Sequence, residues 1–164
     1  MLRIAGTVND SIVDGPGIRF SLFVQGCPHH CPGCHNPTSH DFAGGKEADA
    51  SEILAQIGRN PLLDGVTFTG GEPLCQAEAL LPIARALPAM GLNLWIYTGY
   101  VLEDILRDPP PGALELIGLA DVLVDGPFIL AERSLELTYY GSRNQRLLDA
   151  KASLKAGRAV LWKP

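Results

Sequence analysis

The chain has 164 residues, of which 46% are hydrophobic and 19% are charged, the ordinary balance of a soluble globular protein, so we expect a single domain over residues 1–164. Its net charge of −5, without a cluster of lysines and arginines, argues against binding to nucleic acid or to an anionic membrane. No apolar run approaches the roughly 20 residues that cross a bilayer, and the first residues lack the features of a signal peptide, which together predict a cytoplasmic protein.

Strands and helices are predicted to alternate along the chain. Runs rich in β-branched and aromatic residues indicate strands, whereas apolar residues spaced three or four apart indicate helices. The expected strands are Ile18–Val24, Val66–Thr69, Asn93–Tyr97 and Asp121–Val124, with weaker candidates at Arg146–Asp149 and Ala159–Trp162. The expected helices are Ser51–Arg59, Val101–Arg107, Ala113–Ala120 and the segment from Pro73 to Gly91, in which Pro82 and Pro88 are expected to begin or break helical pieces.

This alternation predicts an α/β fold with a mostly parallel sheet, a partial (βα)6-type barrel in one domain. In such folds the loops at the carboxyl ends of the strands build the functional site. Loops that begin at Cys27, Gly70, Thr98 and Asp125 each follow a predicted strand. One rim of the sheet is therefore expected to bring these four loops together.

The cysteines are concentrated in the first of these loops. The spacing Cys27-x3-Cys31-x2-Cys34 places three thiols on one short segment, whereas Cys75 stands alone and is expected to be a buried or spare thiol. Three thiolates on a [4Fe–4S] cluster leave one iron open, which implies chemistry. The alternative is a structural zinc site in a non-catalytic interaction module, with Cys27, Cys75 or a histidine completing the Cys31-x2-Cys34 knuckle, but a second such pair is absent.

These motifs carry a family resemblance. The cysteine spacing after the first predicted strand resembles the signature of the radical S-adenosylmethionine (SAM) superfamily, and Gly70-Gly71-Glu72-Pro73 resembles its SAM-binding turn. The segments Asp14–Arg19 and His35–Pro37 are similar to those of glycyl-radical-enzyme activases. Trp95–Tyr100, Val122–Phe128 and Gly141–Arg146 resemble the group that activates anaerobic ribonucleoside-triphosphate reductases, and the likeness runs from about Asp14 to Asp149.

The resemblance implies an oxidoreductase that cleaves SAM reductively with a [4Fe–4S] cluster held by Cys27, Cys31 and Cys34. The 5′-deoxyadenosyl radical, rather than a side chain, would then be the reactive species. It would take a hydrogen atom from a glycine of the large subunit of an anaerobic (class III) ribonucleoside-triphosphate reductase. A flavodoxin-like protein would donate the electron.

The same resemblance assigns contacts to SAM. The backbone of Gly70 and Gly71 would meet its amino acid moiety, and Glu72 its ammonium group. Other expected contacts are Thr98 and Asp125, at the ribose hydroxyls or at a cation near the SAM carboxylate, and Gly33 and His35, at the adenine. The remaining loop histidines, His29 and His30, are expected to face solvent.

Two other enzymatic functions remain open. His35 matches the activases of pyruvate formate-lyase, so the partner can be another glycyl-radical enzyme. Those activases are often longer and have a ferredoxin-like insert, and this short chain with four cysteines cannot hold a second cluster of that kind. Many superfamily members also carry an aromatic residue where this chain has Gly33. The second alternative is a small radical SAM enzyme that acts on a metabolite, against which the Asp14–Arg19 pattern argues.

Overall fold

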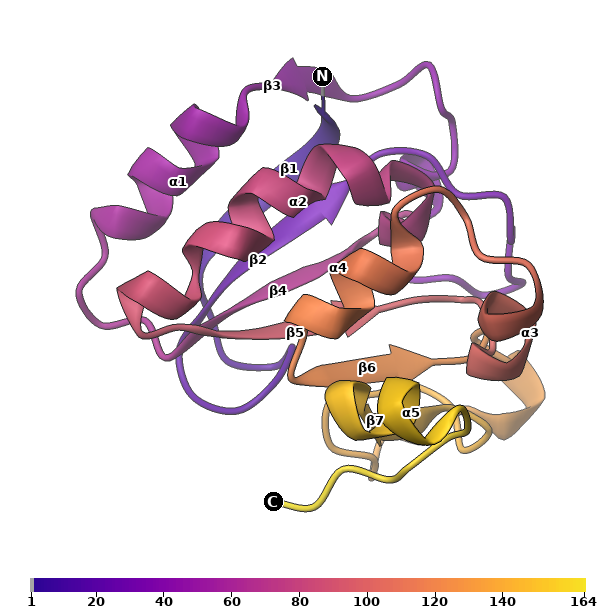
Figure 1. Ribbon diagram of the computed structural model, residues 1–164. Coiled ribbons are helices and arrows are strands. Elements are labelled where there is room, and N and C mark those ends of the chain that lie inside the picture. The colour runs from indigo at the N-terminus through magenta and orange to yellow at the C-terminus, as the bar shows by residue number, and fades with distance from the viewer. Residues whose placement is uncertain (1) are drawn as a thin grey trace.

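The computed structural model describes residues 2–164, and its centre is one seven-stranded sheet (Figure 1). Its strands are β1 (Leu2–Ser11), β2 (Arg19–Val24), β3 (Lys46–Ala48), β4 (Gly65–Gly70), β5 (Asn93–Tyr97), β6 (Val122–Asp125) and β7 (Arg146–Asp149). They lie in the order β3-β1-β2-β4-β5-β6-β7. The central strands β2, β4, β5 and β6 pair in parallel, and the pairs that involve β1, β3 or β7 are antiparallel.

Helices cover one face of this sheet (Figure 1). The helices are α1 (Ala50–Gly58), α2 (Ala77–Ala86), α3 (Leu102–Arg107), α4 (Ala113–Leu119) and α5 (Ala150–Ala156), and the 3-10 turns are η1 (Pro37–Ser39), η2 (Pro73–Gln76), η3 (Pro88–Met90) and η4 (Leu130–Glu132). Helices α1, α2, α4 and α5 pack side by side in that order. Within residues 2–164 no helix is long and apolar enough to cross a membrane.

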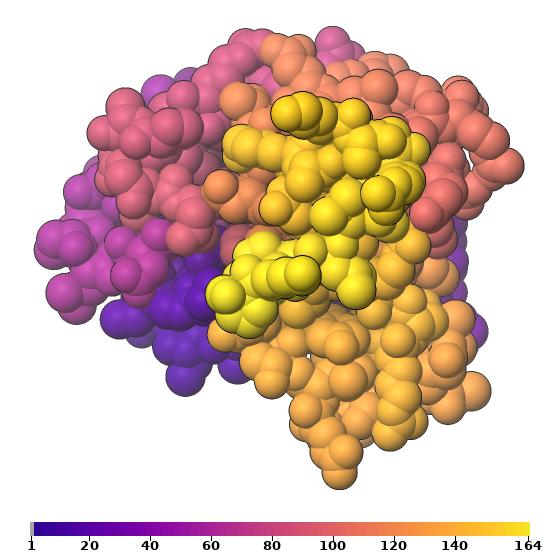
Figure 2. Space-filling view, turned by 60° about the horizontal axis from the view of Figure 1, so that its bottom comes forward, coloured from indigo at the N-terminus to yellow at the C-terminus, as the bar shows by residue number. Residues whose placement is uncertain are grey.

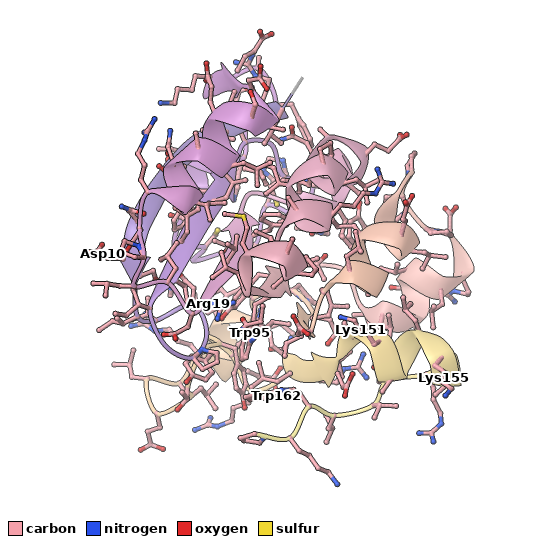
Figure 3. All side chains as sticks on the ribbon, turned by 60° about the vertical axis from the view of Figure 1, so that its left-hand side comes forward. Asp10, Arg19, Trp95, Lys151, Lys155 and Trp162 are labelled. Carbon is pink, nitrogen blue, oxygen red and sulfur yellow. The ribbon has the colours of Figure 1, made fainter. Side chains whose placement is uncertain are left out.

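The opposite face of the sheet is aromatic. Along β5, Leu94 and Ile96 join the core beneath the helices, whereas Trp95 points to the other side because side chains alternate along a strand. There the Trp95 ring meets Tyr139 edge-on at 5.2 Å and Trp162 at 5.1 Å between centroids, and Figure 3 shows Trp95 beside Trp162. Figure 2 shows the C-terminal residues (yellow) beside the segment that joins β6 to β7 (orange). The part of the sheet formed by β5 and β6 is therefore covered on both faces.

The α/β class and most of the predicted elements are confirmed. The four strongest predicted strands match β2, β4, β5 and β6, and the weaker candidate Arg146–Asp149 is β7. The candidate Ala159–Trp162 is wrong, because this segment makes only an isolated bridge between Leu148 and Leu161. The central strands follow one another without the closure that a barrel would show, so the partial (βα)6 barrel stays a prediction.

Two further differences concern the N-terminal strands and a proline. Strands β1 and β3 were not expected from the sequence. Pro82 neither begins nor breaks a helix but lies inside α2, whereas Pro88 begins η3 as predicted. A proline inside a helix costs about 3 kcal/mol, and the burial of Leu80, Leu81 and Ile83 around it offsets that cost.

Candidate functional site

The loops that follow β2, β4 and β5 meet at one rim of the sheet, as the sequence predicted, and they surround the carboxylate of Glu72. Glu72 is 0% exposed and precedes η2, where its Oε2 accepts a hydrogen bond from Leu74 N at 3.0 Å. From the loop after β5, Thr98 Oγ1 lies 2.9 Å from both carboxylate oxygens, and Gly99 N donates to Oε1 at 2.8 Å. From the cysteine loop, His29 Nε2 lies 2.6 Å from Oε1. An ionised carboxylate only accepts, so Nε2 carries the proton of this bond.

The expectation that His29 faces solvent is therefore wrong. Its side chain is only 17% exposed, and its ring also packs edge-on against Tyr100 at 4.6 Å between centroids. Gly99 is needed at this contact, because a Cβ there would lie 2.4 Å from His29 Cδ2. His30, in contrast, is exposed as predicted. No pattern in the sequence indicates that one histidine of the pair bonds to Glu72.

The glycine pair before Glu72 allows a close approach between two loops. Gly70 has φ +94°, a conformation that favours glycine, and a Cβ on Gly71 would lie 2.4 Å from Gly26 O. Gly71 N donates to Val24 O at 2.9 Å, and Glu72 N to Gly26 O at 2.8 Å. The turn after β4 thus runs directly against the residue that precedes Cys27.

The three clustered cysteines lie on the loop after β2, whose start is hydrogen-bonded to its end and which contains a tight turn. Cys27 N donates to His40 O at 3.1 Å, and Cys34 N donates to Cys31 O at 3.1 Å. Cys27 is buried, which raises the pKa of its thiol, and Cys31 and Cys34 are partly exposed. Asn36 N lies 3.4 Å from Cys34 Sγ, where it donates to the sulfur.

Within residues 2–164 no three Cys, His, Asp or Glu side chains are grouped tightly enough to hold one metal ion. A [4Fe–4S] cluster binds each thiolate through a different iron, so its ligands stand farther apart than those of a single ion. Three reduced thiols on one loop that are not gathered around a single point fit such a cluster better than one zinc ion. Cys75 lies elsewhere, after β4, and is exposed rather than buried; its Sγ is 3.9 Å from Tyr100 Oη.

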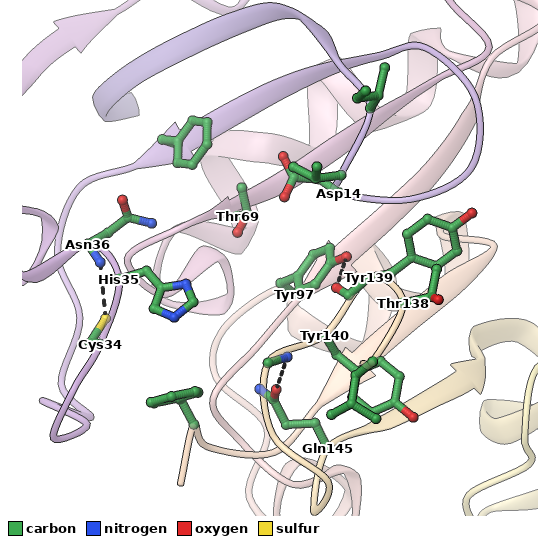
Figure 4. Close-up of a pocket in the computed structure, with 16 residues that line it drawn as sticks. Asp14, Cys34, His35, Asn36, Thr69, Tyr97, Thr138, Tyr139, Tyr140 and Gln145 are labelled. Atoms are coloured by element: carbon green, nitrogen blue, oxygen red, sulfur yellow. Dashed lines mark hydrogen bonds between the residues drawn. The ribbon is translucent and has the colours of Figure 1, made fainter. Parts of the chain in front are cut away.

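Beside the cysteine loop, a cavity of about 590 Å³ opens on the sheet face opposite the helices (Figure 4). Cys34, His35 and Asn36 form one wall, and Thr69 and Tyr97 form part of the floor at the ends of β4 and β5. The remaining lining residues come from β2, the loop before it and the segment after β6, namely Ile12, Val13, Asp14, Phe23, Phe128, Leu137, Thr138, Tyr139, Tyr140, Gly141 and Gln145. Among the predicted SAM contacts, His35 alone lines this cavity.

The wall that contains Asp14 is held from beneath by a buried arginine. Arg19 is 0% exposed and donates to Thr67 Oγ1 at 2.8 Å, Pro16 O at 3.0 Å and Val66 O at 2.9 Å. Thr67 Oγ1 donates in turn to Asp14 O at 2.7 Å. Burial lowers the pKa of Arg19 to about 10, which leaves it a cation at neutral pH.

The other predicted contacts are placed as follows. Gly33 and His35 are exposed at the tip of the cysteine loop, where a Cβ on Gly33 would lie 2.9 Å from Leu130 Cδ1 and the His35 ring lies 5.4 Å from that of Phe128. Asp125, at the end of β6, is 1% exposed. Thr98 bonds to Glu72 rather than to Asp125.

Sequence reasoning missed the three tyrosines that line the cavity, Tyr97, Tyr139 and Tyr140. Tyr139 has φ +78°, unusual for a residue with a side chain, and its carbonyl oxygen accepts a hydrogen bond from Tyr97 Oη at 2.5 Å (Figure 4). Burial raises the pKa of Tyr97. No local sequence pattern relates two residues that are 42 positions apart.

Comparison with known proteins gives a consistent set of relatives. The family model of the 4Fe-4S single cluster domain matches residues 13–148. The anaerobic ribonucleoside-triphosphate reductase-activating protein of Haemophilus influenzae is 35% identical over 144 residues, 82% of this chain and 89% of that protein. The protein of the same name from Escherichia coli K12 is 32% identical over 142 residues, 82% of this chain and 90% of that protein.

A second kind of activating enzyme is also similar. The pyruvate formate-lyase-activating enzyme of Clostridium pasteurianum is 44% identical over 116 residues, which cover 65% of this chain but only 49% of that protein. The two kinds of relatives differ in length, and the first kind matches this chain over most of both sequences.

Proposed function

This chain belongs to the 4Fe-4S single cluster domain family and, within it, to the radical SAM activating enzymes of glycyl-radical proteins, and from this we propose its reaction and its partner. It reductively cleaves SAM and generates a glycyl radical on the large subunit of an anaerobic (class III) ribonucleoside-triphosphate reductase. When bound, the cluster supplies the electron for this cleavage. The observation that carries the proposal is the position of the three-thiol loop, whose Cys34 borders the 590 Å³ cavity.

Cys27, Cys31 and Cys34 are proposed to hold the [4Fe–4S] cluster. The Asn36 amide beside Cys34 Sγ supports this assignment, because hydrogen bonds to the sulfurs tune an iron–sulfur cluster. Cys75 stays free, since a fourth thiolate would close the iron that SAM needs. The chain contributes ligands, orientation and exclusion of water, and none of its side chains is proposed to be a catalytic residue.

The proposed SAM contacts are those implied by the family. The backbone of Gly70 and Gly71 runs against the residue before Cys27, which supports a contact beside the proposed cluster. Glu72 is proposed to meet the ammonium group, which requires that His29 leave Oε1, because this carboxylate is already fully engaged. The remaining proposed contacts are Thr98, Asp125, Gly33 and His35.

The partner is proposed to complete the site. The cavity is open to one side, and Ile12 and Val13 at its edge are 71% and 67% exposed. A radical must be shielded from water and oxygen, so the glycine loop of the reductase is proposed to close the opening of a partial barrel. A flavodoxin-like donor in the cytoplasm would supply electrons, and neither nucleic acid nor membrane takes part.

Two measurements test the proposal. Anaerobically purified protein should contain about four iron and four sulfide per chain, whereas one zinc would support the interaction module instead. With dithionite, SAM and the reductase of the same organism, a glycyl-radical doublet should appear in electron paramagnetic resonance. Replacement of the reductase glycine by alanine should remove the doublet.

Matched cysteine variants test the ligand assignment. Cys27→Ala, Cys31→Ala and Cys34→Ala should each lose SAM cleavage, whereas Cys75→Ala should keep an intact cluster. Loss of iron from Cys75→Ala, with a SAM-responsive cluster in one of the other three, would contradict the assignment.

A second candidate partner is a formate-lyase-type glycyl-radical enzyme. It is favoured by the 44% identity to the Clostridium pasteurianum activase over 116 residues, and by the resemblance of His35 to the matching residue of formate-lyase activases. Parallel assays with both kinds of partner decide between them by which one acquires the radical. If neither does and a small metabolite accelerates SAM cleavage, the metabolite enzyme becomes the better interpretation.

A further inference from the structure

The carboxylate of Asp125 is already neutralised by a guanidinium. Arg146, on β7, donates from Nε to Asp125 Oδ1 at 3.0 Å and from Nη2 to Oδ2 at 2.5 Å, and Leu102 N donates to Oδ2 at 2.8 Å. Asp125 is 1% exposed, while the Arg146 side chain is 31% exposed. The pair is bidentate and has one member fully buried, a geometry in which an arginine holds a carboxylate firmly.

A cation bound by Thr98 and Asp125 does not fit these contacts. Both oxygens of Asp125 face hydrogen-bond donors. Thr98 Oγ1 donates to Glu72 and accepts from Tyr100 N at 3.1 Å. A second positive charge beside the guanidinium would be repelled in this poorly hydrated position.

We infer that Arg146 is the built-in counter-cation of Asp125, so that this chain needs no bound monovalent cation at the end of β6. The inference concerns the chain itself and is independent of its reaction. A second edge of the guanidinium is also used: Glu103, in the first turn of α3, accepts from Nη2 at 2.7 Å and from Nη1 at 3.3 Å. One arginine thereby joins β7, the end of β6 and the start of α3.

Arg146 acts on the site through Asp125, as a positioning residue. The loop that leads from β5 to α3 carries the Thr98 and Gly99 groups that bond to Glu72. Where this loop enters α3, Leu102 N donates to the Asp125 carboxylate. Within the loop, Tyr100 O accepts a hydrogen bond from Gly126 N at 2.8 Å. Loss of the guanidinium would therefore loosen the loop that holds Glu72.

The test compares monovalent cations in thermal unfolding of the full chain. Melting temperatures of wild type and Arg146→Met are measured in KCl, NaCl and choline chloride at equal ionic strength, since choline is too large to replace a bound metal ion. Arg158→Met is the matched control, because Arg158 is exposed and forms no ion pair within residues 2–164.

The wild type and Arg158→Met should melt at the same temperature in all three salts. Arg146→Met should melt lower by roughly 5–15 °C in choline chloride, because a buried carboxylate loses its partner, and should recover part of this loss in KCl or NaCl as a cation takes the vacated position. If Arg146→Met does not fold, Asp125→Asn combined with Arg146→Met should restore folding, since both charges are then removed.

Specific stabilisation of the wild type by K⁺ or Na⁺ would overturn the inference. The inference would also be overturned if Arg146→Met had the same melting temperature as Arg158→Met, or if KCl and NaCl did not raise the melting temperature of Arg146→Met above its value in choline chloride. A combined variant that unfolds more readily than Arg146→Met alone would overturn it too. None of these readouts uses SAM cleavage, so the proposed reaction can fail while the inference stands, and the reverse.

Discussion

Replacement of Glu72 by alanine is expected to weaken the fold as well as the site. The substitution removes the acceptor of two backbone N–H groups, those of Leu74 and Gly99, at a position that is 0% exposed. A buried donor without a partner costs about 1–3 kcal/mol, so the two together predict a loss of roughly 2–6 kcal/mol in the free energy of unfolding. The Thr98 hydroxyl can rotate and His29 can reach water, so these two add less.

Urea unfolding of the metal-free chain, followed by far-ultraviolet circular dichroism under reducing conditions, measures this loss. Thr98→Val is the matched comparison, because it keeps the shape of the side chain and removes only the hydroxyl that donates to Glu72 and accepts from Tyr100 N, at a cost of about 1–3 kcal/mol. Glu72→Gln keeps an acceptor oxygen for the backbone donors and should lie between the two. In a thermal scan, the alanine variant should melt lower by roughly 5–15 °C.

An unfolding free energy for Glu72→Ala within about 1 kcal/mol of the wild type would refute this reasoning, because it would mean that water replaces the carboxylate without cost. The same variants separate stability from ligand binding. If Thr98→Val folds like the wild type and Glu72→Gln folds but does not bind SAM, the carboxylate charge meets the ligand. Equal SAM affinity in Glu72→Gln would assign Glu72 to loop architecture alone.

Three other outcomes are expected. Gly71→Ala should lower the yield of folded protein or its melting temperature, because the new Cβ would lie 2.4 Å from Gly26 O, and a melting temperature equal to the wild type would show that the two loops can separate. Trp162→Ala should cost about 1–3 kcal/mol in urea unfolding and change the near-ultraviolet circular dichroism; an unchanged spectrum would contradict the aromatic packing. The hydrogen bond from Arg146 lowers the pKa of Glu103 from 4.5, so its stabilisation is present above that pH and is lost as the pH falls through the lowered value. The stability difference between the wild type and Glu103→Gln should therefore shrink in acid, and a difference that grows as the pH falls would contradict this assignment.

The strands that the sequence predicts best are those buried on both faces. β5 was predicted over Asn93–Tyr97, its observed range, because a continuous apolar and aromatic run is what a strand between two packed layers requires. β1 gave no such signal: after Ile4 its side chains are mostly exposed up to Ser11, and it is held by pairing with β2. Strand β3 has only three residues and is defined by its pairing with β1, so no local pattern could predict it.

The candidate site likewise has features that local sequence patterns predict and features that they do not. The cysteine spacing and the glycine pair before Glu72 are visible in the sequence because each is a local requirement, of ligand number in one case and of close backbone approach in the other. Side-chain hydrogen bonds between neighbouring strands are not local in the sequence. The bond between Arg146 and Asp125 joins residues that are 21 positions apart, and no local pattern relates them.

The position of the cavity follows from the order of the strands. Three successive crossovers, β2 to β4, β4 to β5 and β5 to β6, move in one direction along the sheet, and right-handed crossovers then place every helix on the same face. The other face is left to the aromatic side chains of β5 and to the segment after β6, which cannot fill it completely. Since the parallel strands also end at one rim, the loop with Cys34 lies where the open face and the rim meet. The topology, more than any single motif, places the loop that carries the three cysteines beside the cavity, which Cys34 lines.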